Sequence, residues 1–252
     1  MVGQFVALGT GWLLSRLAAD SRVAREPTNP APVQDAQRGV WRYSVESPYL
    51  SGSNAIEVLV PDKLELGQQC RVLYVLPVDV GIGGQWGDAL REVKKAGIHN
   101  RHHLICVCPA FDTLPWFGAH AQDARIRHEA YLTNVVIPLI DRAFPTLATP
   151  AGRLLFGFSK SGVGAFALLV RHPDLFGYAA AWDAPLMMRQ EDLGLYGTKD
   201  HFGTREQFAQ YLPRELFKLH AAEWQGPARL VLAGADNFGA ETRGMHELLE
   251  QL

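Results

Sequence analysis

The sequence predicts an α/β protein with a mostly parallel sheet that helices cover on both faces. From residue 40 onward, short apolar strands alternate with segments whose apolar residues recur at helical spacing, the pattern of right-handed βαβ units. Arg71–Val78 and Leu104–Pro109 are nearly continuous apolar runs, as strands buried on both faces should be. A length of 252 residues fits one domain, which we expect to span residues 40–252.

Residues 1–39 are expected to lie outside this domain. Phe5–Leu14 is a short apolar stretch and Ser21–Gly39 is polar and contains proline, an order that resembles a signal h-region followed by a linker. Met1–Gln4 carries no Lys or Arg, so a cytoplasmic location is favoured, and export is the alternative if residues 1–20 are a signal peptide. No run approaches the roughly 20 apolar residues of a membrane-spanning helix, so we expect no membrane span.

The elements of the domain follow from periodicity and turn residues. Val40–Val45 and Ala55–Val60 alternate like antiparallel strands. The further elements expected, in chain order, are strand Arg71–Val78, helix Trp86–Ala96, strand Leu104–Pro109, helix Asp123–Phe144, strand Arg153–Phe158, helix Ser161–Arg171, strand Tyr178–Trp182, an irregular stretch Leu186–Trp224, strand Arg229–Ala233 and helix Glu241–Leu252. Pro138 should kink the long helix or split it. In open sheets of this class the active site lies at the carboxyl ends of the strands, so the residues just after each strand are the candidates.

The strongest signal is a serine at the corner between a predicted strand and a predicted helix. Residues 157–164 read GFSKSGVG, with Ser159 directly after the strand. Small residues on both sides allow a tight turn that pushes the serine hydroxyl out above the sheet, as in a nucleophile elbow. The usual spelling, G-x-S-x-G, has a second glycine where this chain has Ser161. The alternative is an ordinary turn in which Ser159 caps the helix.

Three segments carry a resemblance to a known family: FDTLPWFGAH (111–120), GFSKSGVG (157–164) and HPDLFGYAAAWDAPL (172–186). The chain resembles the putative esterase family, an α/β-hydrolase group related to esterase D, feruloyl esterases and mycolyltransferases, from about residue 55 to the end. The resemblance implies the α/β-hydrolase fold and ester chemistry by a Ser–acid–His triad in that chain order. It also implies one more strand and helix, so a C-terminal strand and helix are expected to be missing from this chain.

The resemblance places the triad acid at Asp236, in the loop after the last predicted strand. A carboxylate there would orient the histidine and stabilise the imidazolium. Asp183, at the end of the preceding strand, is the alternative, and a turn-forming role is the other account of both residues.

The oxyanion hole is expected to use backbone amides from two loops. One is the amide of Lys160, at the positive end of the helix that follows Ser159. The other comes from the loop after Arg71–Val78, at Val78 and Asp79. The glycine-rich turn beside it suggests dinucleotide binding, but G-x-G-x-x-G would need glycine at position 86, which is Trp86.

The triad histidine is the difficulty, because none of the nine histidines follows Asp236 at the place that the resemblance requires. His120 and His201, both expected in loops, are the only stand-ins. We expect His120 to line the substrate pocket together with Trp116 and Phe117, and core packing is the alternative for these aromatic residues.

Composition excludes several other functions. The net charge of −2, with no block of like charges, argues against a nucleic-acid partner. Cys70, Cys106 and Cys108 are expected to be small buried hydrophobes, since no second cysteine pair stands at zinc-site spacing; no metal or cofactor is expected.

We therefore expect a serine carboxylic-ester hydrolase that acts on a small-molecule ester through an acyl-enzyme on Ser159, impaired by the absence of the triad histidine. A catalytically inactive binding protein of the same fold is the alternative, and an enzyme that uses His120 or His201 as its base is the third reading. The sequence leaves the oligomeric state and the acyl and alcohol specificity open.

Overall fold

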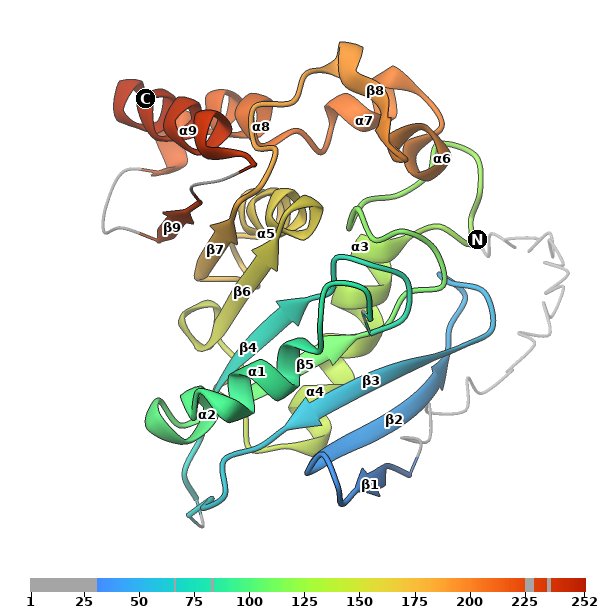
Figure 1. Cartoon of the computed structure of the whole chain (residues 1–252), viewed down its shortest axis with the longest axis vertical. Coiled ribbons are helices and arrows are strands. Elements are labelled where there is room, and N and C mark those ends of the chain that lie inside the picture. The colour runs from blue at the N-terminus through green and yellow to red at the C-terminus, as the bar shows by residue number, and fades with distance from the viewer. Residues whose placement is uncertain (1–30, 66, 83, 225–228, 235–236) are drawn as a thin grey trace, which may run out of the picture.

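The domain is built around one β-sheet (Figure 1). A computed structural model describes residues 31–65, 67–82, 84–224, 229–234 and 237–252. Eight strands of this part form one sheet in the order β1-β2-β3-β5-β4-β6-β7-β9. They are β1 (Val33–Asp35), β2 (Val40–Glu46), β3 (Ser53–Leu59), β4 (Arg71–Leu76), β5 (Leu104–Pro109), β6 (Arg153–Phe158), β7 (Tyr178–Trp182) and β9 (Leu230–Ala233). The contacts from β5 to β9 are parallel and the others are antiparallel, so the mostly parallel sheet predicted from the sequence is confirmed.

Helices lie on both faces of the sheet, but unequally. The small cluster of apolar side chains on one face includes residues of α1 (Ala89–Lys95) and α2 (Ile98–Arg101) and residues of β3, β4 and β5. The large cluster on the other face includes residues of α4 (Ile137–Ala143), α5 (Lys160–Arg171) and α9 (Gly239–Gln251). The remaining helices are α3 (His128–Tyr131), α6 (Thr198–Phe202), α7 (Arg205–Ala209) and α8 (Pro213–Leu219). Figure 1 shows α6, α7 and the short strand β8 (Leu193–Tyr196) beyond the carboxyl ends of the parallel strands.

The helix predicted for Asp123–Phe144 begins later and is split. It consists of α3, a π-helical turn at Leu132–Val136 and α4, which has Pro138 in its first turn. Proline has no backbone N–H to donate to the preceding turn, so a change of helical pitch at this point is the expected result.

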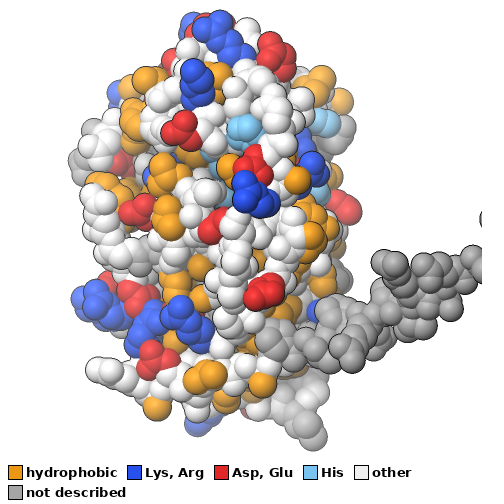
Figure 2. Space-filling view, turned by 90° about the vertical axis from the view of Figure 1, so that its right-hand side faces the viewer, with side chains coloured by type: hydrophobic (Ala, Val, Ile, Leu, Met, Phe, Trp, Pro, Cys, Tyr) orange, Lys and Arg blue, Asp and Glu red, His pale blue; other side chains and the backbone are white. Residues whose placement is uncertain are grey.

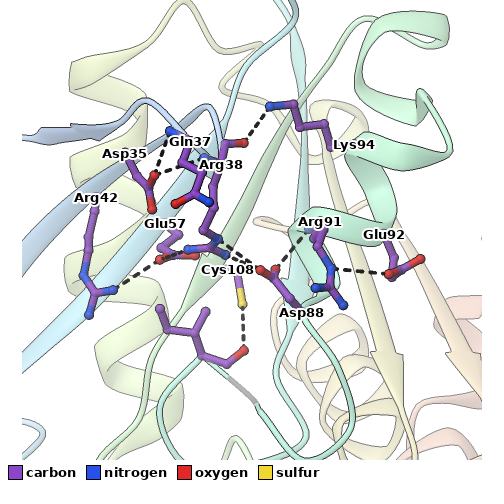
Figure 3. Close-up of polar contacts among 11 residues, drawn as sticks. Asp35, Gln37, Arg38, Arg42, Glu57, Asp88, Arg91, Glu92, Lys94 and Cys108 are labelled. Atoms are coloured by element: carbon purple, nitrogen blue, oxygen red, sulfur yellow. Dashed lines mark hydrogen bonds and ion pairs between the residues drawn. The ribbon is translucent and has the colours of Figure 1, made fainter.

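Residues 31–39 contain structure, although the sequence placed them outside the fold. β1 pairs with β2 in antiparallel register, Asp35 opposite Val40. Arg38 then bridges to the domain: its guanidinium contacts Glu57 Oε1 at 2.6 Å and Asp88 Oδ2 at 2.6 Å (Figure 3). The hydrogen bond that Arg38 donates to Glu57 outweighs the opposing effect of burial, so the pKa of Arg38 is raised. These contacts fasten the edge strand β1 to β3 and to the start of α1.

The three cysteines are free and buried, as the sequence predicts. Cys106 and Cys108 of β5 are fully covered on the α1 face of the sheet. Burial raises the pKa of both thiols, which favours the neutral, unreactive form. Their function is therefore packing.

Candidate active site

Ser159 lies at the corner between β6 and α5 in a strained backbone conformation. Its φ of +53° and ψ of −127° fall where residues with a side chain are rarely found, and such strain costs about 1–3 kcal/mol. Ser159 is the N-cap residue of α5, yet its side chain makes no capping hydrogen bond. The cap interpretation therefore does not describe this residue. The hydroxyl is not engaged by the helix that it precedes.

Ser161, where the usual motif has glycine, has a different role. Its side chain is fully buried, and its hydroxyl oxygen Oγ accepts a hydrogen bond from Phe158 N at 2.9 Å and donates one to Phe158 O at 2.8 Å. The hydroxyl thus satisfies both polar groups of the residue before Ser159. A serine fits the position because its buried hydroxyl fixes the turn through these two hydrogen bonds.

Glycines on either side of the corner allow the strand and the helix to approach closely. A Cβ atom added to Gly157 would lie 2.1 Å from Ser161 O, a backbone atom that cannot easily move. A Cβ added to Gly162 would lie 2.7 Å from Ala184 Cβ. Close packing of β6, α5 and the residues after β7 therefore requires glycine at these two positions.

The predicted oxyanion-hole residues meet at this edge of the sheet. β4 and β6 are parallel neighbours, with Leu76 opposite Gly157, so the loop with Val78 and Asp79 lies beside the corner. Lys160, the first residue of α5, is half-buried; burial lowers the pKa of its ammonium group, and the nearby charge of Asp79 opposes that shift. The N-terminus of a twelve-residue helix adds partial positive charge at the same place. The arrangement suits a developing negative charge.

Asp183 accepts hydrogen bonds from residues at the start of α9. It follows β7, is buried and has a φ of +46°. Its Oδ1 accepts from Phe238 N at 2.8 Å and its Oδ2 accepts from Asn237 Nδ2 at 3.0 Å. These hydrogen bonds, that from the Phe238 amide above all, lower the pKa of Asp183. With both oxygens engaged at the start of α9, Asp183 is poorly placed to orient a histidine. Asp236, the preferred acid, lies outside the described residues.

The histidines proposed as stand-ins lie elsewhere. His201 was expected in a loop but is buried in α6, 4.5 Å from the ring of His128, and burial lowers its pKa to about 3. His120 Nδ1 accepts from Gln122 N and Asp123 N, at 3.0 and 2.9 Å, which fixes its ring in its own loop. All nine histidines fall within the described residues, and none of them is hydrogen-bonded to the Ser159 side chain. In the described part of the chain, the Ser159 side chain therefore has no histidine partner.

Trp116 and Phe117 were expected beside the substrate, yet both are 1% exposed. Trp116 Nε1 donates to Tyr196 O at 3.3 Å, and Phe117 packs edge-on against Phe111 at 5.2 Å. These contacts tie the loop after β5 to the core and to the segment before α6. The structure thus favours the alternative interpretation, in which the two aromatics clamp the core.

Three other aromatic residues, which the sequence interpretation missed, surround the corner. Phe158 directly precedes Ser159, and its ring centroid lies 4.9 Å from that of Trp182 and 6.2 Å from that of Trp86. Trp86 and Trp182 are 60% and 51% exposed. Phe158 and Trp182 are also paired in the register of β6 and β7. The signal available in the sequence was that Phe158 and Trp182 end neighbouring strands at the carboxyl edge of the sheet.

The described residues as a whole give few further hints of a ligand. In the ranges that the structure covers, no three His, Cys, Asp or Glu side chains are grouped as a metal would require. No helix among these residues is long and apolar enough to cross a membrane. On the face of the molecule in Figure 2, side chains of both charges are interspersed.

Comparison with solved structures shows the fold. The chain matches FphF, a fluorophosphonate-binding serine hydrolase of Staphylococcus aureus, with a TM-score of 0.68 and 14% identity over 89% of this chain and 87% of the other. It matches a ferulic acid esterase with a TM-score of 0.66 and 17% identity over 84% and 85% of the two chains. It matches MPT51 of Mycobacterium tuberculosis with a TM-score of 0.57 and 17% identity over 84% and 81%. The chain has the α/β-hydrolase fold.

The match to a family profile covers a shorter part of the chain than the structural matches do. The profile of the putative esterase family matches residues 116–214, a segment that contains Ser159 and Lys160 but ends before Asp236. The resemblance to that family is thereby confirmed. No curated protein sequence matches the chain. The family match and the hydrolase neighbours support a hydrolase of the esterase class.

Proposed function

We propose that the chain is a serine carboxylic-ester hydrolase in which Ser159 is the nucleophile. The observation that carries the proposal is the strained corner at Ser159, where a residue with a side chain holds a φ of +53° and its hydroxyl makes no capping hydrogen bond to α5. Strain of this kind persists where the surrounding structure imposes it, and it is concentrated at functional sites. The close packing at Gly157 and Gly162 is the structure that imposes it here.

The reaction would proceed in two steps. Ser159 Oγ attacks the ester carbonyl carbon while its proton passes to a base, and the carbonyl oxygen becomes an oxyanion held by the amide of Lys160 and an amide of the Val78–Asp79 loop. The C–O bond to the alcohol then breaks, and the alcohol leaves with a proton. Water attacks the resulting acyl-serine in the same way, which releases the acid and restores the hydroxyl.

The general base is the part of the proposed site with the least structural support. Asp236 would orient a histidine, but none of the nine histidines is hydrogen-bonded to Ser159. Removing a triad residue lowers kcat by about 10⁴-fold or more, while the oxyanion hole retains roughly 10³-fold over water. We therefore expect slow turnover of activated esters rather than efficient hydrolysis.

Labelling with a fluorophosphonate probe tests the nucleophile. The wild-type chain should label slowly and Ser159→Ala should abolish the label. Ser53→Ala is the matched control, because Ser53 is exposed on β3 and its hydroxyl contacts only Ser44 Oγ at 2.7 Å. Equal labelling of wild type and Ser159→Ala would show that the nucleophile is another residue. Asp236→Asn should reduce labelling further only if Asp236 belongs to the site.

A catalytically inactive binding protein is the second candidate, favoured by the lack of a histidine partner for Ser159. Such a protein would retain a ligand site at the strand ends without turnover. Hydrolysis of a p-nitrophenyl ester at substrate saturation separates the two. A rate that equals that of Ser159→Ala, together with saturable binding of the ester, would identify a binding protein.

A further inference from the structure

Two histidine side chains are buried against each other between α3 and α6. The ring centroids of His128 and His201 lie 4.5 Å apart in an edge-to-face arrangement, and the two residues are 0% and 3% exposed. We call them the histidine pair. His128 is the first residue of α3 and His201 belongs to α6, so the pair joins two helices that are distant in the sequence.

The histidine pair has few hydrogen-bond partners. His128 Nε2 lies 3.0 Å from Thr113 Oγ1. Within the described structure, His128 Nδ1 and both ring nitrogens of His201 are buried without a hydrogen bond. Buried polar atoms without partners are rare in folded proteins, and a charge on such a ring costs far more than a neutral ring does. The surroundings therefore favour two uncharged rings.

The groups that act on His201 do not change this preference. The backbone of Gly118 and of Leu114, in the loop after β5, favours a charge on that ring. Burial outweighs the backbone and lowers the pKa of His201, and the nearby charge of His120 lowers it further. Burial also lowers the pKa of His128 well below its ordinary value, and the charge of His201 acts in the same direction. Each ring thus opposes a charge on the other.

No carboxylate in the described part of the chain is hydrogen-bonded to either ring. Glu129, the next residue of α3, accepts instead from Arg171 Nε and Tyr211 OH. Asp112, in the loop after β5, accepts from Ser51 N at 2.8 Å. A proton taken up by the histidine pair would therefore have no counter-charge while the pair stays buried.

α6 rests on the loop after β5, residues 110–127. Phe202 O accepts a hydrogen bond from Ala121 N at 3.0 Å. A Cβ atom added to Gly118 would lie 2.5 Å from Phe202 Cε1, so the helix and the loop are in close contact. The charged side chains of α6, Lys199 and Asp200, belong to exposed residues. The buried side of α6 thus depends on apolar contacts and on neutral histidines.

Glycines bound α6 at both ends. Gly197 is its N-cap residue with a φ of +80°, and Gly203 is its C-cap residue with a φ of +78°. Glycine adopts these angles and others at little cost, and hinges are typically a few residues at the ends of elements. α6 lies beyond the carboxyl ends of the parallel strands (Figure 1), the edge of the sheet at which Ser159 lies. A rotation about the two glycines would move α6 without a change in the sheet.

We propose that the histidine pair is an acid-sensitive switch: when His128 and His201 each bind a proton, α6 moves away from the loop after β5, with Gly197 and Gly203 as hinges. In the closed form both rings are neutral and buried. In the open form both are solvated and charged, each having taken one proton from water. The proposal does not depend on whether Ser159 is catalytic.

The direction and size of the effect follow from proton linkage. The pKa of His201 is about 3 in the closed form, against an ordinary value of 6.5 for a solvated ring. Because the closed form has the lower pKa, it is fully favoured above pH 6.5 and loses stability as the pH falls below that value. Each histidine lowers the ratio of closed to open form by up to about tenfold per pH unit. At pH 4.5 the two together lower it by up to about 10⁴-fold.

Hydrogen–deuterium exchange of the full chain at pH 7, 6, 5 and 4.5 tests the switch. Dividing each measured rate by the intrinsic rate at the same pH removes the direct effect of pH on exchange. Between pH 7 and 4.5, protection of the peptide that contains residues 198–203 should fall by about tenfold or more. Protection of β5 and β6 should stay within about twofold, because the sheet remains folded. Glu129 does not interfere in this range, since its pKa is about 2.

Neutral substitutions identify the responsible groups. His201→Leu leaves no partner atom unpaired, since neither ring nitrogen of His201 has one among the described residues, and it should make the fall in protection smaller. His128→Leu with His201→Leu should abolish the fall. His246→Leu is the matched control, because His246 is exposed on α9 and should keep the wild-type pH profile.

Three outcomes would overturn the proposal. One is a wild-type chain in which residues 198–203 are equally protected at pH 7 and 4.5. Another is a loss of protection in β5, β6 and α6 together, which would be acid unfolding of the whole domain. The third is a double variant that retains the wild-type pH profile, which would assign the effect to other groups. The first two outcomes are decided on the wild-type chain, so the test does not depend on how well the variants fold.

Discussion

The two faces of β6 and β7 differ sharply in exposure. Under α5, Leu155, Ala179 and Ala181 are at most 2% exposed and belong to the large apolar cluster. On the opposite face, Tyr178 and Trp182 of the same strand are 38% and 51% exposed. The close contacts of Gly157 and Gly162 at the Ser159 corner lie on the covered face. The opposite surface, which we call the open face, is formed by Phe158, Tyr178, Ala180, Trp182, Val231 and Ala233.

This difference indicates which contacts keep Ser159 in its strained conformation. The φ of +53° at Ser159 is imposed by contacts on the covered side: Gly157 against Ser161, and Gly162 against Ala184. Changes under α5 should therefore destabilise the domain, whereas changes on the open face should not.

Phe166→Ala should lower the free energy of unfolding by about 3–5 kcal/mol, since it leaves a cavity in a packed interior. Phe166 of α5 is fully buried and packs edge-on against Phe217 of α8 at 6.0 Å. Tyr178→Ala, on the open face, should cost less than about 1 kcal/mol. Urea unfolding followed by circular dichroism measures both. Equal losses would show that the two faces are equally important to the fold.

Glu129 links α3, α5 and the segment after α7 on the covered side, and it makes stability depend on pH. Its carboxylate accepts from Arg171 Nε at 2.7 Å and Tyr211 OH at 2.8 Å, and lies 2.7 Å from His172 Nε2. Burial alone would raise the pKa of Glu129, but the hydrogen bonds from His172 and Arg171 outweigh it and lower the pKa to about 2, from an ordinary value of 4.5.

The folded-state pKa lies below the unfolded one, so this stabilisation is complete above pH 4.5 and is lost as the pH falls through about 2. The loss should be roughly 3 kcal/mol, at 1.36 kcal/mol for each pKa unit. Unfolding by urea at pH 7, 4.5, 3 and 2 measures it. Glu129→Gln should be less stable at pH 7 and should lose less on acidification. A variant with the same pH profile as the wild type would assign the effect to other carboxylates.

Part of the fold and of the candidate site could be predicted from the sequence. The elbow was found because small residues and a serine at a strand–helix corner are a local signature, and β5, β6 and β7 begin and end as predicted. The burial of Trp116 and Phe117 was only the alternative interpretation, and that of His201 was missed, because their partners are distant in the sequence. Periodicity alone does not reveal that the segment after β7 folds back over the loop after β5.

Neighbouring alanines in β7 give a matched pair on the two faces. Ala181→Val should cost about 1–3 kcal/mol by overpacking, because Ala181 Cβ lies 3.1 Å from the Cβ position of Gly162 in α5. Ala180→Val points to the open face and should change stability by less than about 0.5 kcal/mol. The same substitution is thus compared one residue apart. A larger effect at Ala180 than at Ala181 would reverse the assignment of the faces.

Ser159→Gly should raise the free energy of unfolding by about 1 kcal/mol, because glycine adopts a φ of +53° without strain. Ser159→Ala is the control: it removes the same hydroxyl but keeps the Cβ atom, and its stability should remain near that of the wild type. A gain in Ser159→Gly that is absent in Ser159→Ala would measure the strain itself, since neither variant has a nucleophile. Equal stability of the two variants would mean that the covered face does not hold the corner under strain.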